Sequence, residues 1–245
     1  MCTVTLAPLR GRSKSFVLTS NRDEAPGRET LPPQIYTEAG VKMLFPKDVE
    51  AGGTWLGVSE RQRLICLLNG EFESHLRKPP YRLSRGVVVK DLLAAEGEDL
   101  ATVAEDYDLT DIEPFTIIAA EWASKMTFSE LVWDGRRKHF RNLEPRPLIW
   151  SSSPLYNAEM KQQRENWFSK LQTQEELEAN SLLNFHSSAG SGDNNTDVVM
   201  DRGFVKTRSI SQVILSEEEL RFFYRDLATD EVTKMAFSKD LSRSI

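Results

Sequence analysis

The second residue of the chain is Cys2, one of two cysteines among 245 residues. Methionine aminopeptidase removes Met1 when the second residue is small, so Cys2 would begin the mature chain with a free α-amine. The pKa of an α-amine is about 7.7–8.0, far closer to neutrality than that of a lysine. The amine, directly or through a water, can take the thiol proton, and the thiolate is the reactive species. The other interpretation is that Cys2 is only a permitted second residue.

A dense polar cluster with the sequence SNRDE occupies Ser20–Glu24. Residues 2–9 and 15–20 have the composition of two β-strands, and the glycine and charges between them favour a hairpin turn. In a hairpin the second strand runs back toward Cys2. A carboxylate there could hold the new ammonium, and an arginine could lower the pKa of the thiol. The cluster is also typical of a capped, solvated turn.

The rest of the chain alternates between groups of strands and groups of helices. Prolines predict a loop at 21–33, and glycine and asparagine predict another at 189–203. Capping residues and apolar spacing predict helices at 84–97, 98–107, 153–172 and 173–188. Further strands are expected at 63–69, 114–122, 126–135, 138–144, 206–216, 220–227 and 231–238. This order favours an α+β fold of antiparallel sheets with helices layered against them.

Composition and charge exclude several classes of function. The chain has 31 basic and 37 acidic residues, a net charge of −6 and no basic block, so nucleic acid is not an expected partner. No apolar run approaches the ~20 residues of a membrane span and no apolar signal region is present, so we expect a cytoplasmic protein. Cys66 stands in an apolar run and is expected to be a buried hydrophobe. The three histidines lie far apart in sequence, so neither a metal nor a bound cofactor is expected.

Five short motifs occur in an order that is specific to one family. They are Met1-Cys2, TSNRDE at residues 19–24, GGTWLG at 52–57, LLNG at 67–70 and KTRS at 206–209. On these motifs the sequence resembles the NRDE family, also called the transport and Golgi organisation family, over essentially its whole length. That family is similar to the N-terminal nucleophile hydrolases, among them the choloylglycine amidases. The resemblance implies one domain, residues 1–245, folded as a four-layer αββα sandwich of antiparallel sheets.

The resemblance also implies catalytic roles for individual residues. Cys2 would be both nucleophile and base, and Asp23 would hold its amine. Asn69 would donate a hydrogen bond to the oxyanion, and Arg208 would be a late active-site arginine.

Two positions depart from the amidase pattern. Ser20 stands where the amidases carry an arginine, and an arginine is found at Arg22 instead. Ser152 or Ser153 occupies the place of a second oxyanion asparagine, and a serine hydroxyl has a shorter reach than an amide. Loss of one oxyanion donor typically lowers kcat by ~10²–10³.

The remaining candidate residues would contact the substrate. They are Asn21, Arg22, Ser152 and Ser153, together with Trp55 of GGTWLG. The large apolar face and the N–H group of Trp55 suit a pocket wall. The same residue is also typical of a strand start that packs in the core.

The sequence leaves three functions open. The first is hydrolysis of a linear, non-peptide small-molecule amide through an acyl-enzyme on Cys2. The second, which the family resemblance suggests, is non-catalytic transport of a hydrophobic ligand, either haem or an acyl lipid, with Cys2 or a histidine as the iron ligand. The third is a plain interaction protein, which would leave the combination of Cys2 and SNRDE unexplained.

Overall fold

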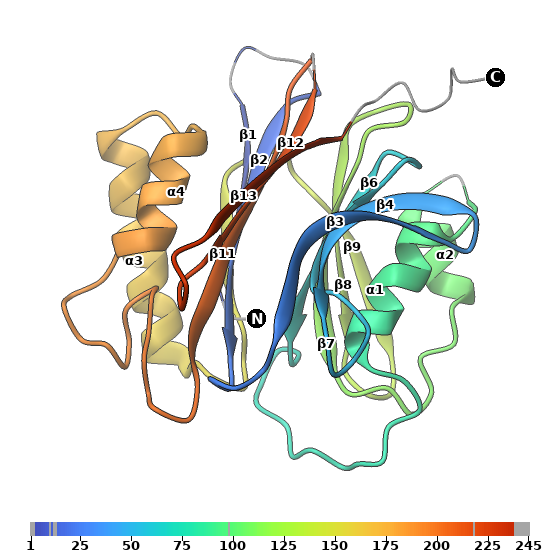
Figure 1. Ribbon diagram of the computed structural model, residues 1–245, viewed down its shortest axis with the longest axis horizontal. Helices are drawn as coiled ribbons and strands as arrows, with labels where there is room; N and C mark the ends of the chain where they lie inside the picture. Colours follow the sequence, from blue (N-terminus) through green and yellow to red (C-terminus); the bar gives the residue numbers. More distant parts are fainter. Residues whose placement is uncertain (1–2, 10, 12–13, 98, 218, 238–245) are drawn as a thin grey trace. The chain divides into compact units, whose positions relative to one another are not determined.

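A computed structural model describes residues 3–9, 11, 14–97, 99–217 and 219–237. The chain divides into two compact units. The first comprises Met1–Arg28 and Pro145–Ser238, and the second comprises Glu29–Glu144 and Lys239–Ile245. In the described residues each unit holds one antiparallel sheet and two helices (Figure 1). The predicted α+β class is therefore confirmed, whereas a single domain over residues 1–245 stays a prediction.

The first unit is built around a six-stranded antiparallel sheet. Its strands are β1 (Thr3–Pro8), β2 (Phe16–Glu24), β10 (Leu148–Ser151), β11 (Lys206–Leu215), β12 (Leu220–Asp226) and β13 (Val232–Phe237). Their order across the sheet is β10-β1-β2-β11-β12-β13. β1 and β2 form the predicted hairpin, and β11, from the far end of the sequence, pairs with the other side of β2. Backbone hydrogen bonds therefore hold β2 along both of its sides.

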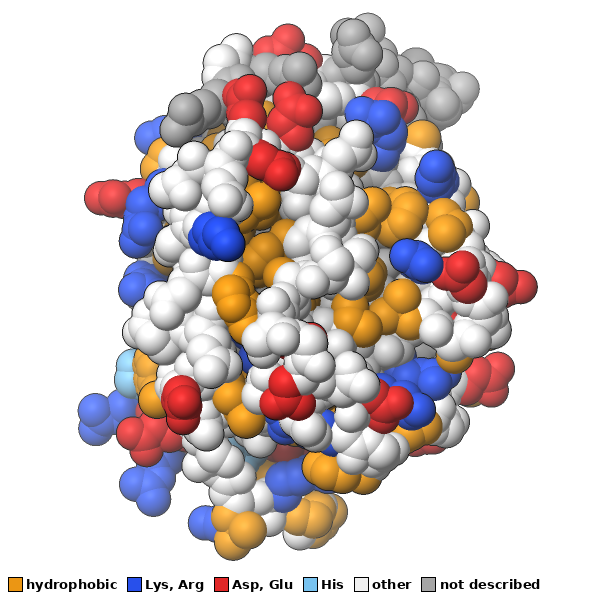
Figure 2. Space-filling view, turned by 90° about the vertical axis from the view of Figure 1, so that its left-hand side faces the viewer, with side chains coloured by type: hydrophobic (Ala, Val, Ile, Leu, Met, Phe, Trp, Pro, Cys, Tyr) orange, Lys and Arg blue, Asp and Glu red, His pale blue; other side chains and the backbone are white. Residues whose placement is uncertain are grey.

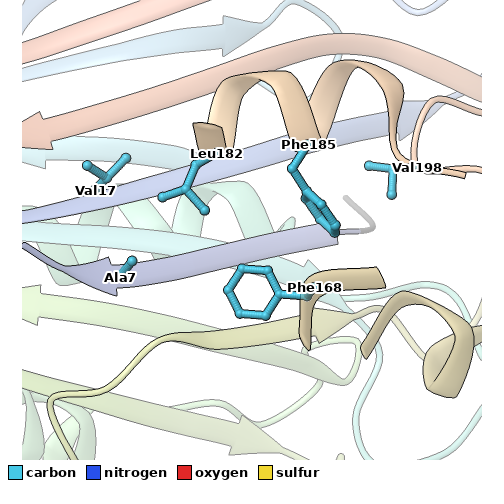
Figure 3. Close-up of a cluster of buried hydrophobic side chains, with 6 residues drawn as sticks. All are labelled: Ala7, Val17, Phe168, Leu182, Phe185 and Val198. Carbon is cyan, nitrogen blue, oxygen red and sulfur yellow. The ribbon is translucent and has the colours of Figure 1, made fainter. Parts of the chain in front are cut away.

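Two helices, α3 (Ala158–Gln174) and α4 (Ala179–Ser188), lie on one face of this sheet (Figure 1). The Asn157 side chain caps α3, and a capping box begins α4. Figure 2 shows the helix-bearing side, where hydrophobic side chains are visible among charged ones. Between the helices and the sheet lies a cluster of buried side chains (Figure 3): Ala7, Val17, Phe168, Leu182, Phe185 and Val198.

The position of Val17 in this cluster defines the two faces of β2. Alternate residues of a strand point to opposite faces. Asn21 and Asp23 therefore point with Val17 toward the helices, whereas Ser20 and Arg22 point to the opposite face. All four polar residues are at most 3% exposed. The SNRDE motif thus divides its buried polar side chains between both faces of the sheet.

The second unit contains a seven-stranded antiparallel sheet. In sequence and in spatial order its strands are β3 (Thr30–Glu38), β4 (Val41–Asp48), β5 (Leu56–Ser59), β6 (Arg63–Asn69), β7 (Phe115–Glu121), β8 (Thr127–Trp133) and β9 (Lys138–Leu143). Its helices α1 (Arg85–Ala94) and α2 (Leu100–Asp106) are capped by the side chains of Ser84 and Asp99. No helix in the described parts of either unit is long and apolar enough to cross a membrane.

The structure corrects the prediction that residues 21–33 form a loop. β2 continues through the polar cluster to Glu24, and β3 begins at Thr30. Pro32 and Pro33 lie in β3, an edge strand, where the register shifts between Leu31 and Gln34. Edge strands and bulges are the places where a sheet tolerates proline, which is why these prolines do not end the strand. The strands β4 and β10 are also absent from the sequence-based assignment.

Two glycines of GGTWLG have backbone roles. Gly52 has a φ of +64°, in the left-handed region that favours glycine. Gly53 lies against Gly86 in the first turn of α1, where an added Cβ would come within 2.4 Å of a backbone carbon. The N–H of Thr54 donates to the carbonyl oxygen of Gly86 at 3.1 Å. The motif therefore fixes the start of α1 against the segment that leads into β5.

Replacing Gly53 by alanine is expected to destabilise the protein by about 2–3 kcal/mol, because the methyl group would overlap backbone atoms that cannot turn away. Gly27→Ala is the matched control, since a Cβ there meets nothing within 4 Å. Urea denaturation of both variants measures the difference. Equal midpoints for the two variants would contradict the close approach of Gly53 to Gly86.

Candidate active site

Strand β1 begins at Thr3, between two partner strands. Thr3 pairs with Asn21 of β2 on one side and with Ser151 of β10 on the other. Cys2 lies outside the described residues, and a peptide bond joins it to Thr3. The side chains around Thr3 therefore define the candidate active site.

The side chain of Asn21 is held by α4 and the loop after it. Its Nδ2 donates to the carbonyl oxygens of His186 at 3.0 Å and of Val198 at 3.1 Å. Oδ1 of Asn21 is therefore the acceptor for Nδ1–H of His186, and Nε2 of His186 accepts from the Thr5 hydroxyl at 2.8 Å. Complete burial lowers the pKa of His186 to about 3. This neutral network joins β1, β2 and α4, and a substrate contact for Asn21 stays a prediction.

Both carboxylate oxygens of Asp23 accept hydrogen bonds on the helix-facing side. The Tyr156 hydroxyl donates to Oδ2 at 2.7 Å, and the Thr207 hydroxyl donates to Oδ1 at 2.6 Å. The guanidinium carbon of Arg164 lies 3.7 Å from the centroid of the Tyr156 ring, which suits a cation–π contact. Each carboxylate oxygen has two acceptor sites. Asp23 is thus firmly positioned, and its role toward the amine of Cys2 stays a prediction.

Replacing Asp23 by alanine is expected to destabilise the protein by about 2–4 kcal/mol, because two buried hydroxyls lose their acceptor. Asp23→Asn keeps one carbonyl oxygen and should lose less. Thr207→Val should lower the free energy of unfolding of the wild-type chain. In Asp23→Ala it should cause little further loss, since the hydrogen bond between the two residues is already gone. Urea denaturation of the single and double variants completes the cycle. Simple additivity would contradict the coupling.

The opposite face of the sheet carries a second polar group, which we call the arginine cluster: Arg22, Arg208, Ser209 and Tyr224. It forms at a β-bulge in β11. Thr207 pairs with Asp23 and Ser209 pairs with Arg22, so Arg208 is an extra residue without its own partner in β2. Because of the bulge, Thr207 bonds Asp23 on the helix side while Ser209 lies beside Arg22 on the other.

The pKa of Tyr224 reflects the charges of the two arginines of the arginine cluster. Burial and then the charge of Asp226 raise the pKa of Tyr224 to about 12, whereas Ser209 and the charges of Arg22 and Arg208 oppose the shift. The hydroxyl therefore keeps its proton at neutral pH and is available as a donor. The charges of both guanidinium groups thus act on this one hydroxyl.

Ser152 and Ser153 follow β10 directly after Ser151, the strand partner of Thr3. They are 3% and 7% exposed, and the described residues offer neither hydroxyl a hydrogen-bond partner. Buried hydroxyls without a partner are uncommon in native proteins. An oxygen of a bound ligand would provide the missing acceptor.

Two of the predicted site residues belong to the second unit. Asn69 is the last residue of β6, where it pairs with Phe115 and is half-buried. Trp55 precedes β5, is 4% exposed, and its carbonyl oxygen accepts from the N–H of Leu67 at 2.7 Å. Their roles as oxyanion donor and pocket wall stay predictions. Cys66 is buried in β6, as predicted.

The other two histidines also belong to the second unit, and each lies beside a carboxylate. Nε2 of His75 is 3.5 Å from Glu113, and Nε2 of His139 is 2.7 Å from Asp134. Within the described ranges, no group of three or more His, Cys, Asp or Glu residues is placed to hold a metal ion.

Sequence reasoning missed four side chains of this site. Tyr156, His186 and Tyr224 come from distant elements and reach the SNRDE segment only through the fold. Thr207 had a local signal, since it stands directly before Arg208 in the KTRS motif.

Solved structures show the class of fold. The chain is similar to the N-acylethanolamine-hydrolyzing acid amidase ortholog of Caenorhabditis elegans, with a TM-score of 0.58 and 13% identity over 86% of this chain and 92% of that one. It is also similar to a variant of the conjugated bile acid hydrolase from Clostridium perfringens, with a TM-score of 0.54 and 10% identity over 96% of this chain and 92% of that one. The fold is that of the N-terminal nucleophile hydrolases, as predicted.

Within that class, the chain belongs to the Transport and Golgi organisation 2 family, whose model matches residues 1–220. This match confirms the family inferred from the five motifs. A comparison with curated proteins gave no match.

Proposed function

We propose that the chain is an amidohydrolase that uses Cys2 as an N-terminal nucleophile on a linear, non-peptide small-molecule amide. The observation that carries the proposal is the register of β1. Thr3 lies between Asn21 and Ser151, and the peptide bond keeps the Cα of Cys2 about 3.8 Å from that of Thr3. The amidase-like fold supports the same proposal.

Acylation would begin when the α-amine takes the proton of the Cys2 thiol and the thiolate attacks the amide carbonyl carbon. Asp23, whose carboxylate is positioned by Tyr156 and Thr207, would hold the resulting ammonium. The hydroxyls of Ser152 and Ser153 would donate to the oxyanion of the tetrahedral intermediate. The ammonium then gives its proton to the leaving amine, the C–N bond breaks, and a thioester remains on Cys2.

Deacylation would reverse these roles with water as the nucleophile. The α-amine takes a proton from the water, and the resulting hydroxide attacks the thioester carbon. The C–S bond breaks and the carboxylic acid leaves. The sulfur recovers its proton from the ammonium, so the chain returns to its starting state without an external co-reactant.

Transport of haem has less support from the side chains. His186 is fully buried and both of its ring nitrogens are hydrogen-bonded. His75 and His139 each face a carboxylate in the second unit. Iron ligation by His186 would require one of its two hydrogen bonds to break.

The test of the proposal is whether Cys2 is a processed, activated nucleophile. Intact mass should show loss of Met1, and brief treatment with substoichiometric iodoacetamide should label Cys2 rather than Cys66. An activated ester should leave a mass increment of one acyl group on the same residue. Cys66→Ala is the matched control and should be labelled like the wild-type chain. Retained Met1, or labelling of Cys2 no faster than that of free cysteine, would overturn the proposal.

A further inference from the structure

The bulge in β11 presents a charged side chain that the proposed chemistry does not use. Arg208 is half-buried, and in the part of the chain that the structure describes its guanidinium forms no ion pair or hydrogen bond. Its backbone is fixed, since its carbonyl oxygen accepts from the N–H of Leu227 at 2.9 Å. β-Bulges often re-aim a side chain next to a functional site. The backbone of Arg208 is therefore held in place, and the N–H donors of its guanidinium are available to a ligand.

Other donors face the same region. Ser211 lies on the same face of β11 as Ser209 and pairs with Tyr224 across the sheet. Its hydroxyl is fully buried and has no hydrogen-bond partner among the described residues. Tyr224 keeps its proton, and Arg22 adds a second buried positive charge. The set combines two guanidinium groups with buried hydroxyl donors.

Two carboxylates lie near this set, and both have other partners. Oδ1 of Asp226 accepts from the backbone N–H groups of Ala228 at 2.7 Å and Thr229 at 3.3 Å. Glu24 lies 3.8 Å from Arg22 and 3.9 Å from Arg28. Neither carboxylate forms an ion pair with Arg208. The described residues therefore supply no hydrogen-bond acceptor to the guanidinium of Arg208 or to the hydroxyl of Ser211.

We infer that the substrate carries a carboxylate, and that Arg208 binds it together with Ser211 and Tyr224. A guanidinium group offers two parallel N–H donors that match a carboxylate. A buried hydroxyl left without a partner penalises a substrate that lacks the group. The inference rests on the proposed amidohydrolase function of this site and narrows its substrates to N-acyl amino acids in preference to uncharged N-acyl amines.

The test compares two ligands that differ only in this charge, N-octanoylglycine and N-octanoylglycinamide. Their dissociation constants are measured by calorimetry on the full chain carrying Cys2→Ala, which removes the nucleophile and so prevents turnover. The carboxylate is expected to bind at least ten-fold more tightly than the amide, and added salt should reduce this ratio. In the same background, Arg208→Gln is expected to bring the ratio close to one.

Three further variants separate recognition from a general loss of structure. Arg208→Lys keeps the positive charge but not the two parallel N–H donors of a guanidinium, so it should retain part of the preference for the carboxylate ligand. Ser211→Ala should reduce the ratio by a few-fold. Arg225→Gln is the matched control, because Arg225 is in the same sheet but on the opposite face from Tyr224, paired with Asp230 at 2.6 Å. It should leave the ratio unchanged.

Hydrolysis of both ligands by the wild-type chain is measured in parallel. Failure of the carboxylate inference can then be distinguished from failure of the proposed amidohydrolase function. Equal binding of both ligands, or a preference that survives Arg208→Gln, would overturn the carboxylate inference even if both were hydrolysed. Selective binding of N-octanoylglycine that depends on Arg208, without hydrolysis of either ligand, would support the carboxylate site and overturn the amidohydrolase function.

Discussion

Replacing Cys2 by alanine is expected to lower kcat/KM for amide hydrolysis by about 10⁴-fold or more, because the nucleophile and its base belong to the same residue. Removal of the nucleophile in other acyl-transfer enzymes causes losses of this order. Steady-state kinetics on a panel of N-acyl amides measures the effect. Cys66→Ala is the control of matched chemistry, since Cys66 is fully buried in β6 of the second unit. It should retain activity.

A second variant separates the thiol from the amine. Inserting a lysine between Met1 and Cys2 prevents removal of the methionine and places the nitrogen of Cys2 in a peptide bond. The thiol remains, but it loses the base that the proposal assigns to it. Activity is expected to fall nearly as far as in Cys2→Ala. Full activity of the insertion variant would show that the α-amine has no role.

Acidification is expected to destabilise the protein through His186. The pKa of this imidazole is about 3 in the folded chain and about 6.5 in an unfolded one. Between these values the unfolded state binds one more proton, so the free energy of unfolding falls as the pH falls through this window. The full loss by pH 3 is about 4–5 kcal/mol, of which about 2.5 kcal/mol is already lost at pH 4.5. Above pH 7 this group should cause no further change.

Two variants test whether this dependence of the free energy of unfolding on pH comes from His186. His186→Gln is expected to be less stable at pH 7, because it disturbs the contacts to Asn21 and Thr5, but its stability should vary less between pH 4.5 and 7. Phe185→Leu loosens the same core but keeps the imidazole, so it should retain the wild-type slope. Urea denaturation across this range provides the data. Parallel curves for wild type and His186→Gln would contradict the assignment.

Local pattern was sufficient to predict much of the fold. The meander β7-β8-β9, the helices α1 to α4 and the final strands all follow from alternation and capping residues. The error at residues 21–33 has a physical cause. Prolines and charges are typical of loops, but β2 keeps its charges buried through tertiary hydrogen bonds, and β3 holds its prolines at a sheet edge.

The candidate site was predicted only where its residues stand in short motifs. SNRDE and KTRS contain Asp23, Arg22 and Arg208, and the structure brings them together through the pairing of β2 with β11. Tyr156 and His186 have no sequence signal, because a lone tyrosine or histidine in a helical region is ordinary. The bulge at Arg208 is also invisible in sequence, since it exists only relative to the register of β2.

The first unit is interrupted in sequence, and this sets the order in which it can fold during synthesis. Residues Glu29–Glu144 of the second unit lie between its two halves. β1 and β2 leave the ribosome early, whereas β11 begins at Lys206, about 10–40 s later at typical elongation rates. Until then β2 lacks one neighbour and Asp23 lacks Thr207, although Tyr156 has been made earlier. The pairing of β2 with β11 and the contact of Asp23 with Thr207 can therefore form only after β11 has left the ribosome.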